Sequence, residues 1–283
     1  MQSNNPCVRW SIQLSLCSVS TIFALLIMGS APTSSVREAW NKVLNTCASS
    51  DLLGKNVIYF GPSNNVGPGS VWRKNANGSY ELRRLTPTTE KWRGIIKPGT
   101  RSTCLNMEMA SWSANSKLLL ESRLAPIEGE LAGLLSKATE VTVKIDGWSL
   151  DQLIEGPFED IVFSLPSQDK YRKDLLADNR LIITKSVRIK GFVTDLKFSK
   201  EDALKLKVKL TSHLTRRLGN YGIDVKANSL SDNVLRVTSS EEFYIAGEFG
   251  KFTPSGFALG GSTYSIEPVS IIGDPPVGVD IRE

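Results

Sequence analysis

Side chains that could do chemistry are few in this sequence, and their spacing selects no reaction. Among 283 residues there is one histidine, His213. A Ser-His-Asp triad would have to use it, and no Gly-x-Ser-x-Gly elbow is present to hold the nucleophile. A histidine-rich zinc site is excluded by the same count. We therefore predict no catalytic residue, no metal site and no cofactor.

Carboxylates are plentiful, with 29 aspartates and glutamates, but no pair is distinguished by its spacing. Glu128 and Glu130 lie two residues apart, so on a helix they would point in different directions. A hydrolase that uses two carboxylates, as glycosidases do, stays open as the third of three hypotheses. Its support is limited to aromatic and Gly-Pro segments that could line a cleft.

The cysteines indicate a disulfide rather than redox chemistry. Two of the four, Cys7 and Cys17, would leave with an N-terminal signal peptide. The other two, Cys47 and Cys104, are too far apart for a Cys-x-x-Cys motif. In an exported chain they are expected to form a disulfide. The alternative is a pair of unrelated buried thiols, as in a cytosolic protein.

The segment from Ser11 to Met28 decides the compartment. Arg9 precedes it and the small residues 29–31 follow it, which is the pattern of a secretory signal peptide. Six serine, threonine and glutamine residues interrupt the apolar run, whereas a membrane span needs about 20 mostly apolar residues. We predict cleavage after Ala31 and export to the periplasm or the medium. A retained membrane anchor is the alternative.

One candidate binding loop lies at residues 61–70, the densest turn cluster in the chain. It follows an expected strand, as a phosphate-binding P-loop does. However, the P-loop lysine is missing, and a strand rather than a helix is expected next. A structural loop is the favoured interpretation. If the loop binds a ligand, the backbone amides near Asn64, Asn65 and Gly67 are the candidates.

Residues 87–103 and their surroundings are basic, and tryptophans are interleaved with the charges. Basic and aromatic residues together are typical of single-stranded nucleic-acid sites. The net charge is only +5, however, and the spacing matches no nucleic-acid module. We therefore predict no nucleic-acid partner. A solvated rim that includes Arg93, above the core tryptophans Trp72 and Trp92, is the favoured interpretation, and the three remain weak binding candidates.

Leucine or valine alternates with lysine in residues 204–210. Read as a strand, this segment presents one row of lysines: Lys205, Lys207 and Lys209. A capping box formed by Ser199 and Asp202 favours a helix instead. We prefer the strand, in a hairpin with the preceding segment. Its lysine row is either a solvated face or a contact surface for an anionic membrane.

Hydrophobic periodicity predicts an α+β fold of mostly antiparallel twisted sheets with a few short helices. The expected strands are residues 56–60, 71–74, 79–85, 118–121, 140–145, 181–198, 235–238, 242–249 and 263–272. Helices are expected at residues 36–53, 126–136 and 211–219, and another is expected to begin at 149–153. Gly191 is expected to mark a bulge in the long segment 181–198.

The chain divides into four regions by composition and pattern. Residues 1–31 are the predicted signal peptide or anchor, and 32–110 hold a helix followed by a β-rich region. Residues 111–272 form an α+β region that either packs on the preceding one or is a second domain. Residues 273–283 are expected to be a flexible tail.

Because the sequence contains no catalytic constellation, the first hypothesis is that the protein is an exported, non-enzymatic protein of the cell envelope or medium. It would bind a protein or an envelope surface, and its mild positive charge would also suit an anionic membrane. The second hypothesis is a secreted membrane-active protein, pore-forming or lytic, in which residues 204–210 insert or assemble. The carboxylate hydrolase is the third, and no oligomeric state is predicted.

Overall fold

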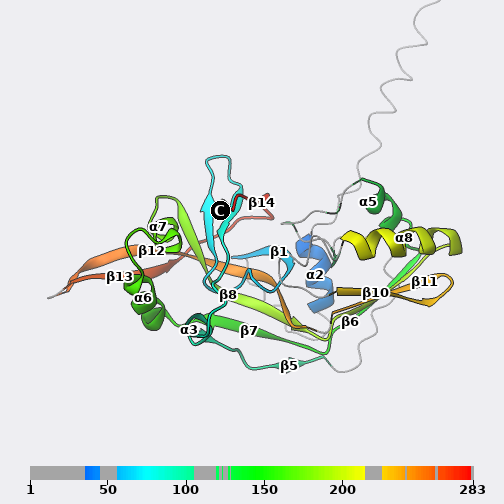
Figure 1. Ribbon diagram of the computed structural model, residues 1–283, viewed down its shortest axis with the longest axis horizontal. Helices are drawn as coiled ribbons and strands as arrows, with labels where there is room; N and C mark the ends of the chain where they lie inside the picture. Colours follow the sequence, from blue (N-terminus) through cyan, green and yellow to red (C-terminus); the bar gives the residue numbers. More distant parts are fainter. Residues whose placement is uncertain are drawn as a thin grey trace, which may run out of the picture. The chain divides into compact units, whose positions relative to one another are not determined.

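Helices and strands are mixed along the chain, which confirms that part of the expected fold class (Figure 1). The computed structural model describes residues 36–44, 56–104, 119–120, 123, 127, 129–213, 225–239, 241–258 and 261–281. These residues all belong to one compact unit, which spans residues 35–283. Every described strand pairing is antiparallel except that of β14 with β3. The twist of the sheets stays a prediction.

The larger sheet has ten strands, of which six follow one path. In spatial order these are β1 (Val57–Ser63), β12 (Phe243–Ala258), β8 (Arg180–Lys190), β2 (Val71–Lys74), β3 (Tyr80–Arg84) and β14 (Val277–Val279). The others are β13 (Gly261–Pro268) on β12, β7 (Gly147–Leu153) on β8, and β4 (Ile96–Lys97) and β5 (Ser102–Thr103) on β7. Strand β8 connects the parts of this sheet, because it pairs with β12, β2 and β7.

The smaller sheet has four strands and is covered by helices. Its order is β10 (Val225–Ser231), β11 (Val234–Ser239), β9 (Val193–Lys197) and β6 (Glu140–Lys144). Helix α8 (Lys200–His213) packs on β10 and β11 and also contacts α5 (Gly129–Leu135). One buried cluster continues from this sheet to α2 (Val36–Leu44) and to the larger sheet, so the two sheets share a core.

Three short helices complete the fold beside the larger sheet. They are α3 (Glu90–Arg93), α6 (Glu155–Ser164) and α7 (Lys170–Leu175). A separate buried cluster joins them to β8 and β12 through Trp92, Phe158 and Tyr171. The Trp92 ring centre lies 4.7 Å from that of Tyr171 and 6.1 Å from that of Phe158. Helix α3 is therefore anchored through its tryptophan although its other side chains are exposed.

The β2–β3 hairpin is confirmed, and its turn shows why. Residues 75–79 connect the strands, and Gly78 has a φ of 80°. Only glycine adopts this left-handed conformation without steric cost. The Asn-Gly signal at this turn was therefore a reliable guide to the structure.

The expected bulge at Gly191 is instead the place where the chain changes sheets. Strand β8 belongs to the larger sheet and β9 to the smaller one, although the pattern read as one continuous segment. Gly191 has a φ of 64°, and the Asp146 side chain occupies the space that a Cβ atom would need. A turn of this kind accepts only glycine, because any side chain would be both strained and obstructed.

The strand expected at residues 204–210 is wrong, because this segment forms the middle of α8. The capping box decides it: the Asp202 amide donates to Ser199 Oγ at 3.2 Å, at the start of the helix. Ala203, Leu206 and Leu210 are buried, and they recur at helical spacing. Lysine alternation with a period of two was thus weaker evidence than the cap.

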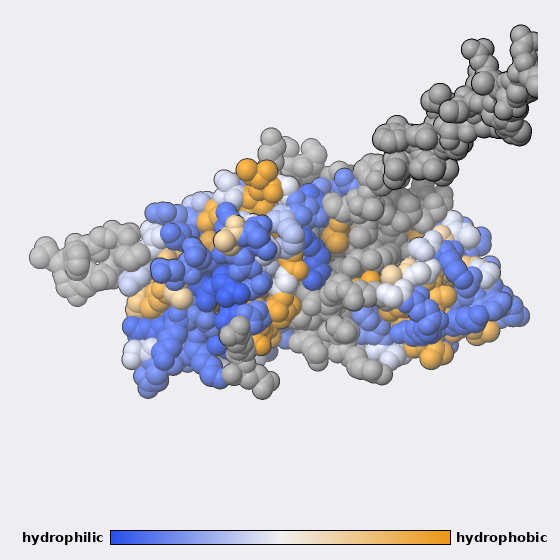
Figure 2. All heavy atoms as spheres, turned by 90° about the horizontal axis from the view of Figure 1, so that it is seen from above, coloured by the Kyte–Doolittle hydropathy of each residue, from blue (hydrophilic) through white to orange (hydrophobic). Residues whose placement is uncertain are grey.

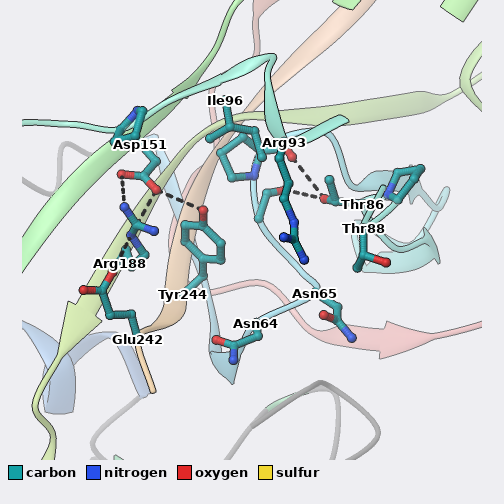
Figure 3. A pocket seen from close by; sticks show the side chains of 14 residues that line it. Asn64, Asn65, Thr86, Thr88, Arg93, Ile96, Asp151, Arg188, Glu242 and Tyr244 are labelled. Carbon is teal, nitrogen blue, oxygen red and sulfur yellow. Dashed lines mark hydrogen bonds and ion pairs between the residues drawn. The ribbon is translucent and has the colours of Figure 1, made fainter. Parts of the chain in front are cut away.

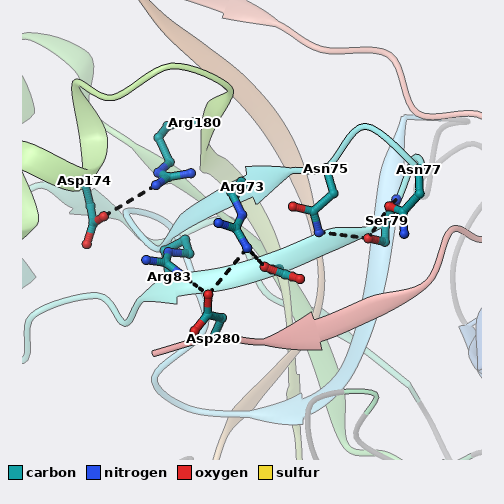
Figure 4. Close-up of polar contacts among 9 residues, drawn as sticks. Arg73, Asn75, Asn77, Ser79, Arg83, Asp174, Arg180 and Asp280 are labelled. Carbon is teal, nitrogen blue, oxygen red and sulfur yellow. Dashed lines mark hydrogen bonds and ion pairs between the residues drawn. The ribbon is translucent and has the colours of Figure 1, made fainter. Parts of the chain in front are cut away.

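Two further expectations are also wrong. Residues 149–153 do not open a helix but belong to β7, where Ser149, Asp151 and Leu153 face inward. The expected flexible tail contains β14, which pairs in parallel with β3. Just after β14, the Asp280 carboxylate forms an ion pair with Arg83 (Figure 4).

Several predictions fall on residues outside the described ranges. These are the signal peptide or anchor, including the segment from Ser11 to Met28, the end of the first helix and Cys47. Cys104 is described and is buried, with 6% of its surface exposed. Its disulfide with Cys47 stays a prediction. Of the helices that are described, none combines the length and the apolar character that a membrane-spanning helix needs.

Candidate functional site

Four of the sequence candidates come together in one pocket of about 430 Å³ (Figure 3). They are Asn64, Asn65 and Gly67 from the loop between β1 and β2, and Arg93 from α3. Sequence reasoning treated the loop and the basic rim as separate candidates, and the fold brings them together. The pocket is also lined by Thr86, Thr88, Asp151, Arg188, Glu242 and Tyr244.

Hydrogen bonds fix the loop that forms one side of the pocket. The Val66 amide donates to Ser63 Oγ at 3.1 Å, and the Thr86 hydroxyl donates to the Pro68 carbonyl at 3.0 Å. Gly67 faces the ring of Tyr244 so closely that a Cβ atom there would lie 2.5 Å from Cε2. The loop is therefore held in one conformation, and Gly67 is needed for space rather than for its φ angle.

Strands β7, β8 and β12, together with the residue just before β12, supply what we call the paired wall: Asp151, Arg188, Tyr244 and Glu242. Asp151 is fully buried. Its Oδ1 accepts hydrogen bonds from the Gly99 amide and the Ser149 hydroxyl, both at 3.1 Å. Its Oδ2 accepts from the Tyr244 hydroxyl at 2.9 Å and pairs with Arg188 Nε at 3.1 Å. A carboxylate has about four acceptor sites, so Asp151 is saturated.

Arg188 joins both carboxylates of the paired wall. Its Nε also lies 3.3 Å from Glu242 Oε2. Glu242 pairs in addition with Arg101 and Lys190. Burial, and then the charge of Asp151, raise the pKa of Tyr244 above its usual range. Tyr244 therefore stays protonated at neutral pH and donates its hydrogen bond permanently.

The opposite side of the pocket, the open wall, consists of Asn65, Thr88 and Arg93. Figure 3 shows these three side chains across the pocket from Asp151, Arg188 and Glu242. Within the described part of the chain, none of the three has a side-chain hydrogen bond or an ion pair. Thr88 and Arg93 are exposed and Asn65 is half-buried. The open wall thus presents a guanidinium, an amide and a hydroxyl that are all available to a ligand.

The tryptophans are core residues and not part of the pocket. Trp72 is fully buried, its ring centre lies 5.4 Å from that of Phe249, and its Nε1 donates to Ser70 Oγ at 3.0 Å. Trp92 is the buried residue of α3. Neither can stack on a ligand, and Trp92 instead positions its neighbour Arg93.

The three candidate lysines do not form a row, because they project from a helix. Successive residues of an α-helix are rotated by about 100°. Lys205 pairs with Glu201 at 2.5 Å, and Lys209 pairs with Glu130. Leu204 and Val208 each directly precede one of these lysines, lie one turn apart, and have 60% and 72% of their surfaces exposed. The lysines of α8 do not line the pocket.

Sequence reasoning missed the paired wall and Thr88. One signal was available for Asp151, which stands at an inward position of the alternating segment 149–153. A charged residue at a buried strand position indicates a partner, because a buried charge without one is costly. The signal was lost when that segment was read as a helix. No group of three or more metal-ligating side chains occurs within the described ranges.

Comparison with known proteins identifies no family for this chain. No protein-family model matches the sequence, and no curated protein matches it either. Among solved structures, the structure of a bacterial gasdermin from Bradyrhizobium tropiciagri is similar, with a TM-score of 0.37 and 12% sequence identity. The match covers 81% of this chain and 95% of that chain. A likeness this weak carries no argument about the pocket or about function.

Proposed function

We propose that this protein is an exported, non-enzymatic binding protein that receives part of a protein or envelope-surface partner in the pocket. The observation that carries the proposal is the contrast between the two walls. The polar groups of the paired wall contact one another and further neighbours such as Ser149, Arg101 and Lys190. Those of the open wall, Asn65, Thr88 and Arg93, have no partner among the described residues.

The paired wall argues against the carboxylate hydrolase. Such an enzyme needs one carboxyl group to give a proton and another to attack or to activate water. Asp151 is buried and accepts four contacts, and it shares the guanidinium of Arg188 with Glu242. Neither carboxylate is free for either task, so a structural role fits both better.

The rim of the pocket suits a group carried by a large partner. Thr88, Arg93 and Pro98 line the pocket and are exposed. A protruding side chain or chain end can therefore reach the open wall from solvent while the remainder of the partner rests on the rim. Function is commonly carried in this way by loop residues on a rigid sheet.

The test is to fill the pocket without disturbing the fold. Thr88→Trp places a large side chain at the pocket, and Thr89→Trp is the matched control. Thr89 is exposed, does not line the pocket and makes no side-chain cap to α3. Labelled protein is titrated onto intact cells and envelope fractions of the producing organism. We expect Thr88→Trp to weaken saturable binding by about tenfold or more, while Thr89→Trp binds normally. Equal binding by both variants would rule the pocket out.

A second candidate function is membrane activity, which the surface of α8 favours. Leu204 and Val208 are exposed beside Lys205 and Lys209, a combination that suits the interface of an anionic membrane. The patch is small, and on the face seen in Figure 2 hydrophilic residues separate the apolar ones. Insertion of residues 204–210 as a strand is not part of this candidate, because they form a helix.

Vesicles that contain phosphatidylglycerol and a trapped dye test the second candidate. If α8 binds the membrane, replacing both Leu204 and Val208 by serine should reduce binding and leakage. Neutral phosphatidylcholine vesicles serve as the charge control. If micromolar protein neither binds nor releases dye, this candidate is removed.

A further inference from the structure

We infer that the pocket recognises a carboxylate on a polypeptide partner, and that Arg93 is the residue that binds it. The inference rests on the proposed binding function and names the chemistry of its ligand. It follows from which polar groups of the pocket are free, how many there are, and which charges face them.

Arg93 is an unpaired cation on an anchored helix. It follows the buried Trp92, whose packing against Phe158 and Tyr171 anchors α3. The guanidinium has no partner among the described residues, whereas Lys91 of the same helix donates to Ser164 Oγ at 2.9 Å. A planar guanidinium binds a carboxylate through two parallel N–H···O bonds. It suits a planar, singly charged group better than a lysine would.

The neutral donors of the open wall complete the site for such a group. A carboxylate that receives two hydrogen bonds from Arg93 has about two acceptor positions left. The amide of Asn65 and the hydroxyl of Thr88 lie on the same side of the pocket as Arg93 (Figure 3). The Asn65 amide group carries two N–H donors and the Thr88 hydroxyl carries one, so the open wall has enough free donors for the two remaining acceptor positions.

The charges of the pocket favour a carboxylate over a phosphate. A phosphate monoester carries a charge of about −1.5 to −2 at neutral pH. Arg188, the other arginine of the lining, is already shared between Asp151 and Glu242. Among the described lining residues, Arg93 is thus the single cation without a partner, and Glu242 would repel a doubly charged group. One free positive charge matches one carboxylate.

The apolar lining favours a polypeptide over an acidic sugar. Ile96, Pro87 and Pro98 can contact the methylene groups of a glutamate or aspartate side chain. A sugar ring would instead need the open face of an aromatic ring. The two tryptophans near the site are buried, and the Arg188 guanidinium lies over the ring of Tyr244 at 6.0 Å from its centre.

Titration with short blocked peptides, followed by NMR of the Arg93 Nε–H signal, tests the inference. The probes are acetyl-Gly-Glu-Gly-amide, its glutamine and phosphoserine counterparts, and methyl glucuronide. Loss of the signal in Arg93→Lys assigns it. We expect the Arg93 Nε–H signal to shift as the glutamate peptide is added. The shift should approach saturation at a peptide concentration of about 10 mM, as expected for weak binding of a single group. The other three probes should bind about tenfold more weakly or not at all.

Variants distinguish the contribution of the planar guanidinium geometry of Arg93 from the contribution of its positive charge. Arg93→Lys keeps the charge and should still weaken binding of the glutamate peptide about tenfold. Because this variant lacks the Arg93 Nε–H signal, its binding is measured from the backbone amide signals of Asn65 and Thr88. Lys97→Gln is the control: Lys97 is an exposed cation on β4 that does not line the pocket. It should change the affinity less than about twofold, since it alters only the surrounding field.

The outcomes distinguish the inference from the proposed function. If no probe shifts the Arg93 signal, or if the glutamine, phosphoserine or glucuronide probe binds as well as the glutamate peptide, the inference is wrong. The pocket remains a binding site in those cases provided that Thr88→Trp abolishes partner binding. If partner binding survives Thr88→Trp, the proposed function itself fails.

Discussion

The two walls of the pocket use similar residue types for opposite purposes. Each holds an arginine next to uncharged polar groups, but only the paired wall also holds carboxylates. In the paired wall, each charged side chain forms an ion pair with a neighbour. On the open wall, the Arg93 side chain forms no ion pair or hydrogen bond with the described residues. Whether a polar group supports the fold or is available to a ligand is thus decided by its neighbours and not by its type.

Position in the fold explains the difference. Ser149 on β7, Arg188 on β8 and Tyr244 on β12 are register partners, so they form one row across three strands. The residues of the open wall lie outside the sheet, in the loop after β1 and in the segment from Thr88 to α3. Side chains in a strand row meet neighbours at short range, whereas loop side chains do not.

The largest expected effect is on the paired wall. Asp151→Ala removes a fully buried carboxylate that is an acceptor for three half-buried groups: Arg188, Tyr244 and the Gly99 amide. Breaking a buried ion pair from one side typically costs about 3–5 kcal/mol of the free energy of unfolding. Urea unfolding measures it. Asp151→Asn keeps one acceptor oxygen and should lose less. A cost below about 1 kcal/mol for Asp151→Ala would mean that the paired wall does not support the sheet.

A smaller effect on the free energy of unfolding is expected where the loop between β1 and β2 contacts the paired wall. In Gly67→Ala, the new methyl group would lie 2.5 Å from the Tyr244 ring, so the ring or the loop must move. Overpacking of this kind costs about 1–3 kcal/mol in unfolding free energy. The matched control is Gly133→Ala in α5, where a Cβ atom meets nothing within 4 Å. That variant should be neutral or slightly stabilised. Equal stability of the two variants would contradict the close approach.

The sequence could predict what depends on neighbouring residues. The β2–β3 hairpin follows from its Asn-Gly turn, and α2 and α5 follow from apolar spacing. Helix α8 was predictable from Ser199 and Asp202, but a conflicting period was preferred. The loop between β1 and β2 was predictable as a loop because turn residues gather there, whereas its role in binding stays a prediction. Each of these features is set within a few residues of chain.

The paired wall could not be predicted because it depends on long-range pairing. In the sequence, Arg188 follows Asp151 by 37 residues and Tyr244 follows it by 93 residues. Only the sheet order brings them together, and that order was not derivable from local pattern. For the same reason, the sheet change at Gly191 was read as a bulge. The local sequence pattern shows the glycine, but it does not show that the Asp146 side chain occupies the position of a Cβ atom at Gly191.

Tyr244→Phe tests the paired wall through pH. It removes a hydrogen bond to a charged acceptor, which is worth about 1.5–3 kcal/mol at neutral pH. The folded-state pKa of Tyr244 lies above the unfolded value near 10. The stability that this raised pKa provides is therefore present below about pH 10 and is lost as the pH rises further.

Stability curves of both proteins at pH 7 to 11 give the measurement. Wild type should be the more stable at pH 7, and the difference should narrow above about pH 10. Tyr59 and Tyr171 also have raised pKa values from burial, but both proteins contain them, so their contributions cancel. A difference that does not change with pH would mean that Tyr244 ionises alike in both states.

The smallest effect is expected on the open wall, and it completes the contrast. Arg93 is exposed and has no partner in the described chain, so Arg93→Gln removes no interaction that the fold uses. Exposed substitutions of this kind usually change the unfolding free energy by less than about 0.5 kcal/mol. Urea unfolding of Arg93→Gln beside Asp151→Ala gives the comparison directly. If Arg93→Gln cost as much as Asp151→Ala, Arg93 would support the fold, and a ligand would not be needed to account for it.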